Sequence, residues 1–174
     1  LLWVFWSINI NMISVLGKNV YISNNTFKNN QNIVNVDLCN KQWVDNIAWN
    51  AFGNCSNLRS VVNMSNSTTN IGWTFSDCKR LVNAPVIPNS VTTMRSTFYQ
   101  CYNLVNAPVI PNSVINMYQT FCFCTNLVNA PAIPNGITNM YQTFMGCQNL
   151  VNAPVIPNSV TDMYRTFEYC NSLI

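Results

Sequence analysis

Cysteine offers the most direct chemistry in this chain, because six of its eight copies recur at every twenty-third position. These six are Cys55, Cys78, Cys101, Cys124, Cys147 and Cys170. In stacked repeats, equivalent cysteines can approach within the ~4.4–6.8 Å between Cα atoms that a disulfide spans, so disulfides or a zinc site are one interpretation. The other is that each cysteine is a small buried apolar side chain. The series follows the spacing of Phe and Met and contains no Cys-x-x-Cys pair, which favours buried free cysteines.

Two cysteines, Cys39 and Cys122, fall outside this series. Cys122 stands where other copies of the repeat carry Tyr99, Met145 and Glu168. Because bulky and charged side chains share this position, we expect Cys122 to face solvent and to be chemically reactive.

The positions that vary between copies are candidates for binding rather than for reaction. The residues after each repeated Met and Phe differ from copy to copy and should face solvent, and tyrosine and arginine, which are enriched at interfaces, recur there. An exposed row of Tyr118, Tyr141 and Tyr164 with an arginine at each end is the best candidate binding face, although ordinary surface variation explains the pattern equally well. The candidate binding residues are Tyr118, Tyr141, Tyr164, Arg95, Arg165, Tyr99, Phe123 and Tyr169.

Asparagine also recurs with the repeat, in two series. They are Asn83, Asn106, Asn129, Asn152 and Asn89, Asn112, Asn135, Asn158. A flat polar array for carbohydrate or ice is one interpretation. The favoured one is that stacked amides bond to each other and to the turn backbone.

Catalysis finds little support in the sequence. The chain has no histidine, and its five acidic residues occupy unlike positions of the repeat. They are Asp37, Asp45, Asp77, Asp162 and Glu168. No paired carboxylates, nucleophile motif, glycine-rich phosphate loop or metal-ligand cluster is apparent. We therefore expect no enzyme activity, no cofactor and no metal.

The amino-acid composition argues against several further classes of protein. The 174 residues carry a net charge of +3, only 7% are charged, and 31 are asparagine, so binding to nucleic acid or to an anionic membrane through charge is not expected. A 49% apolar content argues against disorder. No apolar run reaches the length of roughly 18 residues that would predict a membrane span. The chain starts without Met and stops inside a repeat, which indicates a piece of a longer protein.

The repeat itself predicts how these residues are positioned. Four regular copies begin at Leu81, Leu104, Leu127 and Leu150, and weaker copies precede them, with one longer step of 25 residues from Phe27 to Phe52. We predict a cap or degenerate repeat over residues 1–25, irregular repeats over 26–80, and four regular repeats over 81–174, with the array truncated at its C-terminus.

Within one copy, Met94, Phe98, Cys101 and Leu104 have the spacing of a short amphipathic helix, with Asn89-Ser90 as its N-cap. A strand over 84–87 should be very short, because proline has no N–H to donate. Such a unit cannot cover its own apolar side, so the copies must stack into a solenoid with ladders of identical side chains. The ladder residues are Leu81, Leu104, Leu127, Leu150, Phe98, Phe121, Phe144, Phe167, Cys101, Cys124, Cys147 and Cys170.

These motifs resemble the leucine-rich repeats of BspA-like bacterial surface proteins. The likeness is carried by Ile87-Pro88-Asn89-Ser90-Val91, Met94, Thr97-Phe98 and Cys101, repeated in the three later copies. Threonine before Phe, and Ala84-Pro85 at the strand, depart from that family's pattern.

The resemblance implies a right-handed leucine-rich-repeat solenoid with short strands and one short helix per unit. It further implies a non-enzymatic adhesion or recognition module that is exposed at the cell surface or secreted, and that binds protein or carbohydrate on another cell or host surface. The alternative is a structural or host-recognition part of a larger particle such as a phage virion, since related arrays occur in phage proteins. End-to-end self-association is a further expectation, because edge strands present unpaired backbone groups.

Overall fold

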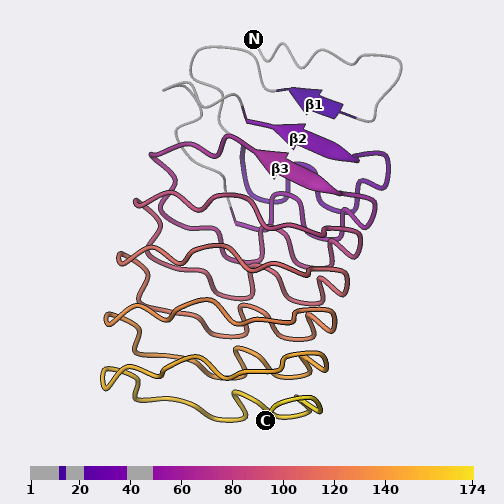
Figure 1. Ribbon diagram of the computed structural model, residues 1–174. Helices are drawn as coiled ribbons and strands as arrows, with labels where there is room; N and C mark the ends of the chain where they lie inside the picture. The colour runs from indigo at the N-terminus through magenta and orange to yellow at the C-terminus, as the bar shows by residue number, and fades with distance from the viewer. Residues whose placement is uncertain (1–11, 15–21, 39–48) are drawn as a thin grey trace.

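Successive copies of the repeat stack as coils along one axis in the computed structural model, which describes residues 12–14, 22–38 and 49–174 (Figure 1). The clearest marker of the stacking is a row of seven phenylalanine rings, one per coil. Neighbouring rings lie nearly parallel, with centroids 5.2–6.0 Å apart. They are Phe27, Phe52, Phe75, Phe98, Phe121, Phe144 and Phe167. The predicted in-register ladder is therefore confirmed.

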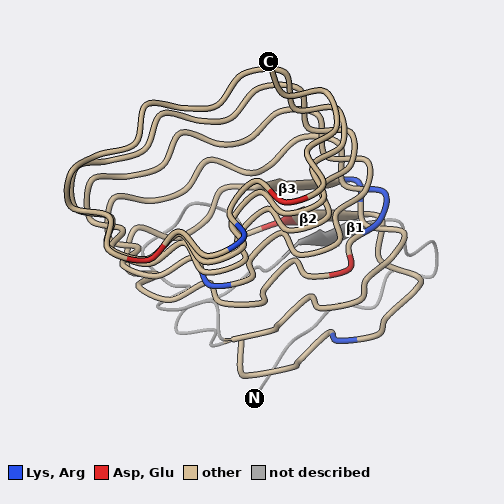
Figure 2. Cartoon of the chain, turned by 90° about the horizontal axis from the view of Figure 1, so that it is seen from below, with Lys and Arg blue, Asp and Glu red and all other residues tan. Residues whose placement is uncertain are grey.

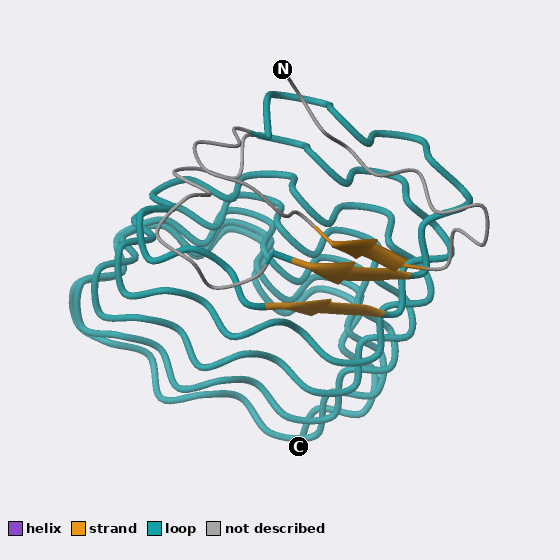
Figure 3. Ribbon diagram, turned by 90° about the horizontal axis from the view of Figure 1, so that it is seen from above, coloured by secondary structure: helices purple, strands orange, loops and turns teal. Residues whose placement is uncertain are grey.

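The strands lie side by side on one side of the stack in the early coils (Figure 3). β1 (Met12–Ser14), β2 (Asn35–Asp37) and β3 (Ser60–Val62) form a parallel sheet in the order β1-β2-β3. The position of Ser60 in β3 is taken by Asn83 in the next coil. From there only single bridges continue the ladder, through Asn106, Asn129 and Asn152.

Proline explains why the regular coils contain bridges instead of strands. The position of Val62 in β3 is taken by Pro85 one coil later, and by a proline in each later copy. Proline cannot donate to a ladder, so pairing stops after one residue. The prediction of a very short strand is confirmed, although the bridge lies at Asn83, one residue before the predicted range. A second bridge ladder, through Thr93, was not predicted.

The predicted helix is wrong: no helix occurs among the described residues. The segment from Met94 to Leu104 instead forms consecutive tight turns, in which the N–H of Thr97 donates to Met94 O and that of Cys101 to Phe98 O. The alternate N–H groups point out of the coil. Those of Ser96, Phe98 and Gln100 donate to carbonyl oxygens of the next coil. The spacing of the turns resembles helical spacing, which is why the buried positions were predicted correctly and the backbone was not.

These outward bonds form three continuous columns of hydrogen-bonded peptides along the stack, hereafter the peptide columns. Each has six N–H···O bonds of 2.7–3.3 Å between seven coils, and in every bond the N–H points to the following coil. In one column, for example, the N–H of Phe75 donates to Thr97 O, and the N–H of Phe98 donates to Thr120 O. The segment thus pairs alternate backbone N–H groups with the next coil, while the N–H groups between them pair within their own coil.

Two residues per coil adopt a left-handed backbone conformation to make these turns. In one regular coil they are Ser96, with φ 51°, and Gln100, with φ 57°. The earliest coils place asparagine at both positions, at Asn25 and Asn29, and asparagine tolerates this conformation better than most residues. A helix cannot contain such residues, so their regular recurrence fixes the turn geometry.

The core fills the inside of the stack. The leucine, phenylalanine, methionine and cysteine ladders are completely buried in the middle coils, as at Met94, Phe98, Cys101 and Leu104. In the four regular coils the threonine before each Phe is buried as well. Its hydroxyl donates to a carbonyl of the preceding coil, as from Thr120 to Met94 O at 2.9 Å. Ser90 does not cap a helix, and its hydroxyl donates to Thr68 O at 2.6 Å.

Candidate functional site

The predicted tyrosine row exists as a stack of three rings, one from each of three successive coils. Tyr118 and Tyr141 lie with centroids 4.8 Å apart and planes at 4°, and Tyr141 and Tyr164 lie 5.3 Å apart at 25°. Tyr118 and Tyr141 are half-buried, and Tyr164 is 53% exposed. Each ring therefore covers a face of its neighbour, while the edges and hydroxyls are left outermost.

The two predicted arginines close the ends of this stack. The guanidinium of Arg95 lies 4.6 Å from the centroid of Tyr118, and that of Arg165 lies 5.0 Å from the centroid of Tyr164. Both contacts are in the range of cation–π attraction. The inner faces are occupied by Tyr141, so each arginine occupies an outer face. We call Arg95, Tyr118, Tyr141, Tyr164 and Arg165 the tyrosine-arginine row.

A hydrogen bond from the backbone N–H of each tyrosine fixes the direction in which that tyrosine leaves the main chain. The side chains of Asn116, Asn139 and Asp162 accept from the N–H two residues later, at 2.9, 3.0 and 3.1 Å. Each is the acceptor of an Asx turn, which sets the direction in which the following tyrosine leaves the backbone. This role was not predicted from the sequence, although the pattern Asn/Asp-Met-Tyr in three copies carries it.

The amide ladder beside the row was also missed. Gln119 donates to Gln142 at 2.6 Å, and Ser96 donates to Gln119 at 3.3 Å. These residues occupy the first left-handed position of their coils. Ser96 is fully buried and Gln142 nearly so, which corrects the expectation that every residue following the repeated Met faces solvent. The left-handed backbone turns this side chain against the neighbouring coil.

Tyr99 and Phe123 belong to a second aromatic series, separate from the row. It runs obliquely across the coils through Trp49, Trp73, Tyr99 and Phe123, with centroids 5.8–6.5 Å apart. The two tryptophans were not predicted from the sequence, because the spacing of the series differs from the repeat period. Phe123 packs over Gly146, where an added Cβ would lie 2.4 Å from the ring. The last candidate, Tyr169, is 60% exposed.

The ladder cysteines are free and hydrogen-bonded. Each Sγ lies 3.0–3.3 Å from the carbonyl oxygen of the phenylalanine in the preceding coil and donates to it. Burial raises the pKa of Cys55 to about 11, and it also raises the pKa values of Cys101 and Cys124. These thiols are therefore packed donors rather than nucleophiles.

The expectation for Cys122 is wrong. Its side chain is 1% exposed, and burial raises its pKa to about 12. Its position is at least half covered by neighbouring turns in every regular coil, and only a long side chain such as Tyr99 reaches past them. A cysteine is too short to do so. Cys39 lies outside the described residues.

The favoured interpretation of the two asparagine series, that stacked amides bond to each other, holds in part. Asn106 donates to Asn83 at 3.0 Å, and a further series pairs Asn126 with Asn103 at 3.2 Å. The second predicted series, which includes Asn112 and Asn135, is exposed. Among the described residues, one amide hydrogen bond therefore joins two members of the first series, Asn83 and Asn106.

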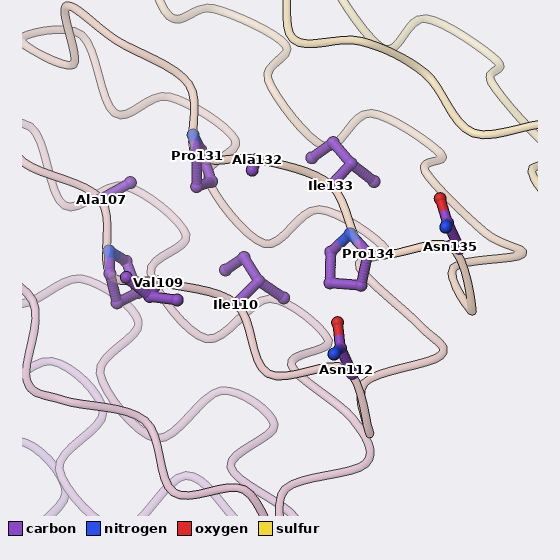
Figure 4. A pocket seen from close by; sticks show the side chains of 10 residues that line it. Ala107, Val109, Ile110, Asn112, Pro131, Ala132, Ile133, Pro134 and Asn135 are labelled. Carbon is purple, nitrogen blue, oxygen red and sulfur yellow. The ribbon is translucent and has the colours of Figure 1, made fainter.

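A hollow of about 470 Å³ lies on the proline-rich surface, between two neighbouring coils (Figure 4). Ala107, Val109 and Ile110 line it from one coil, and Pro131 and Ile133 from the next. Valine at the exposed position of the other regular coils, as at Val109 with 87% exposure, is replaced here by Ala132. The hollow is lined by apolar groups and by the two amides of Asn112 and Asn135.

Charged residues are few and scattered over the described chain (Figure 2). The one ion pair found there joins Arg165 and Glu168, at 3.5 Å. Within the same residues, no three His, Cys, Asp or Glu side chains gather into a metal site, and no helix is available that could cross a membrane.

The solved structures that resemble this chain are leucine-rich repeat proteins of bacteria. A Treponema pallidum leucine-rich repeat protein (TpLRR) superposes with a TM-score of 0.81 at 25% identity, over 95% of this chain and 79% of its own. A Bacteroides ovatus leucine-rich repeat protein gives 0.57 at 18% identity, over 90% of this chain and 48% of its own. A Faecalibacterium prausnitzii protein described as a leucine-rich cell surface protein gives 0.52 at 19% identity, over 92% and 52%.

The chain thus spans about half of the latter two proteins. No curated protein matches the sequence significantly. The family model described as the BspA type leucine rich repeat region matches residues 3–82 and 62–174, in six copies. With stacked coils, in-register ladders and this match over most of its length, the chain belongs to the BspA-type leucine-rich repeat family.

Proposed function

We propose that the protein is a non-enzymatic recognition module that is displayed at a cell surface or secreted, and that binds a partner through the tyrosine-arginine row. The family and the repeat fold support a binding role. The surface description of the similar F. prausnitzii protein supports the location. The partner is a protein or carbohydrate on another cell or host surface.

The observation that carries the proposal is the order built into the row. Its three rings are held by their neighbours, by arginines at both ends and by Asx turns at the backbone. Rigid aromatic and arginine side chains lose little conformational entropy on binding, which is why they dominate interface energetics. The rest of the surface is rich in asparagine and nearly uncharged, so this row stands out from it.

Binding of the labelled protein to intact host cells, measured by flow cytometry, tests the proposal. The variant Tyr118→Ala/Tyr141→Ala/Tyr164→Ala should lose at least tenfold in affinity. The matched control is Val86→Ala/Val109→Ala/Val155→Ala, which trims three side chains that are 87–90% exposed on the proline-rich surface. Equal binding by the tyrosine variant and the wild type would remove the row as the contact surface.

A structural part in a virion is the alternative function. The similar structures are bacterial proteins, one of them described as a cell surface protein, and they support surface recognition instead. Genes flanking the reading frame distinguish the two: virion genes favour the particle, and an export signal favours the surface.

A further inference from the structure

We propose that the tyrosine-arginine row binds a linear acidic polysaccharide, laid along the stack with about one sugar per coil. This inference rests on the proposed function and specifies its ligand. It follows from the ring faces, the exposed hydrogen-bonding groups, the unpaired cation and the spacing of the row.

The ring faces of the row are not available to a ligand. Tyr118 and Tyr141 stack at 4.8 Å, which leaves no room for a third flat group between them. Arg95 and Arg165 occupy the two outer faces. A neutral glycan that binds by laying its sugar rings on aromatic faces therefore finds no free face here.

The groups that remain exposed are hydrogen-bonding and positive. The hydroxyls of Tyr118 and Tyr141 have no hydrogen-bond partner within the described residues, so they are free to bond to a ligand. Arg95 is exposed, and no carboxylate of the described chain lies within salt-bridge distance of it. Its guanidinium carbon lies over the Tyr118 ring, 4.6 Å from the centroid, and its N–H groups can donate to a carboxylate or sulfate of a ligand.

The spacing of the row favours a polysaccharide over an acidic peptide. Its rings repeat at 4.8 and 5.3 Å, which is comparable to the length of one sugar residue in an extended glycan. An extended peptide presents side chains on one face every ~6.6 Å, so it falls out of register with the hydroxyls within two coils. A chain of sugars stays in register along all three tyrosines.

Isothermal titration of the whole chain with a homogeneous galacturonic acid hexamer tests this inference. We expect measurable binding that weakens as salt rises, because ion pairs at the arginines are exposed. Arg95→Gln and the double variant Tyr118→Phe/Tyr141→Phe should each weaken binding about tenfold, and the latter keeps the ring stack. Arg59→Gln, which removes an equal charge from an exposed position outside the row, should leave the affinity unchanged.

The uncharged galactose hexamer and polyglutamate serve as ligand controls. Equal affinity for the uncharged hexamer would overturn the role of charge, and equal affinity for polyglutamate would overturn the choice of a polysaccharide. Absence of binding to the acidic hexamer would also overturn the inference. If the acidic hexamer does not bind, but cells still bind the wild type and not the tyrosine-to-alanine variant, the proposed function stands and only this ligand is rejected. If neither the hexamer nor the cells bind the wild type, both the ligand and the proposed function are rejected.

Discussion

Replacing Gly136 with serine should stabilise the protein, because three sibling copies show what the glycine lacks. Serine at the equivalent position donates to a carbonyl of the preceding coil, from Ser90 to Thr68 O, from Ser113 to Val91 O and from Ser159 to Ile137 O, at 2.6–2.7 Å. The equivalent carbonyl for Gly136 belongs to Val114, and it accepts no hydrogen bond from the described residues.

The site has room for the change. A Cβ built on Gly136 lies 3.6 Å from Asn112 O and 3.8 Å from Val114 O, which is ordinary contact, and the backbone of this glycine is not left-handed. A new hydrogen bond contributes about 0.5–1.5 kcal/mol. Loss of glycine's extra freedom in the unfolded chain contributes about 0.4–1 kcal/mol more.

The sum is about 1–2.5 kcal/mol, and for a chain of this length each kcal/mol raises Tm by roughly 2–4 °C. Differential scanning calorimetry of Gly136→Ser and Gly136→Ala separates the two contributions, since alanine restricts the unfolded chain without adding a donor. Gly136→Ser should melt above Gly136→Ala, and both above the wild type. If serine and alanine melt at the same temperature, the hydrogen-bond reasoning is refuted.

Three other changes test the packing. Gly146→Ala should cost about 1–3 kcal/mol, because the residue has φ 73° and its Cβ would strike the Phe123 ring, and adding Phe123→Ala should restore only the steric part in urea unfolding. Thr120→Val keeps the shape but removes the buried donor to the preceding coil, so urea unfolding should show a loss of about 1–2 kcal/mol, whereas the exposed Thr161→Val should change little. In a Cys39→Ser/Cys170→Ser background, which removes the partly exposed thiol of the last coil, a thiol reagent at pH 8 should label the native protein only after denaturant is added, and rapid native labelling would contradict the burial of the other thiols. Because burial raises the pKa values of these thiols, the unfolded chain releases their protons first as pH rises, so Tm should hold below about pH 8 and fall above about pH 9.

The side-chain ladders could be predicted from the sequence because they depend only on the period of the repeat. A residue such as Phe98 must lie over Phe121 if the copies stack in register, whatever the backbone between them does. The same period explains why the tyrosine row was found. Its ring-on-ring geometry could be expected only in outline, because the direction of each ring is set by Asn116 and Asn139 through Asx turns.

The helix could not be excluded from the apolar spacing alone. Over a segment as short as this one, consecutive tight turns whose left-handed residues lie four positions apart bury nearly the same side chains as an α-helix does. The distinguishing signal was asparagine: Asn25 and Asn29, then Asn50 and Asn54, mark the left-handed positions in the early coils. Later copies carry residues such as Ser96 there, so the signal fades where the repeat is most regular.

The peptide columns have an electrostatic consequence for the whole stack. Each peptide unit is a dipole, and units joined head to tail add their fields, as they do along an α-helix. Here the sum runs across the coils instead of along a helical backbone, and the positive pole of the peptide columns points toward the last coils, since every N–H within these three columns donates forward. The only acidic side chains after residue 80, Asp162 and Glu168, lie at that pole. An aspartate at the equivalent position of an earlier coil would lie in a weaker electrostatic field, so its negative charge should be stabilised less.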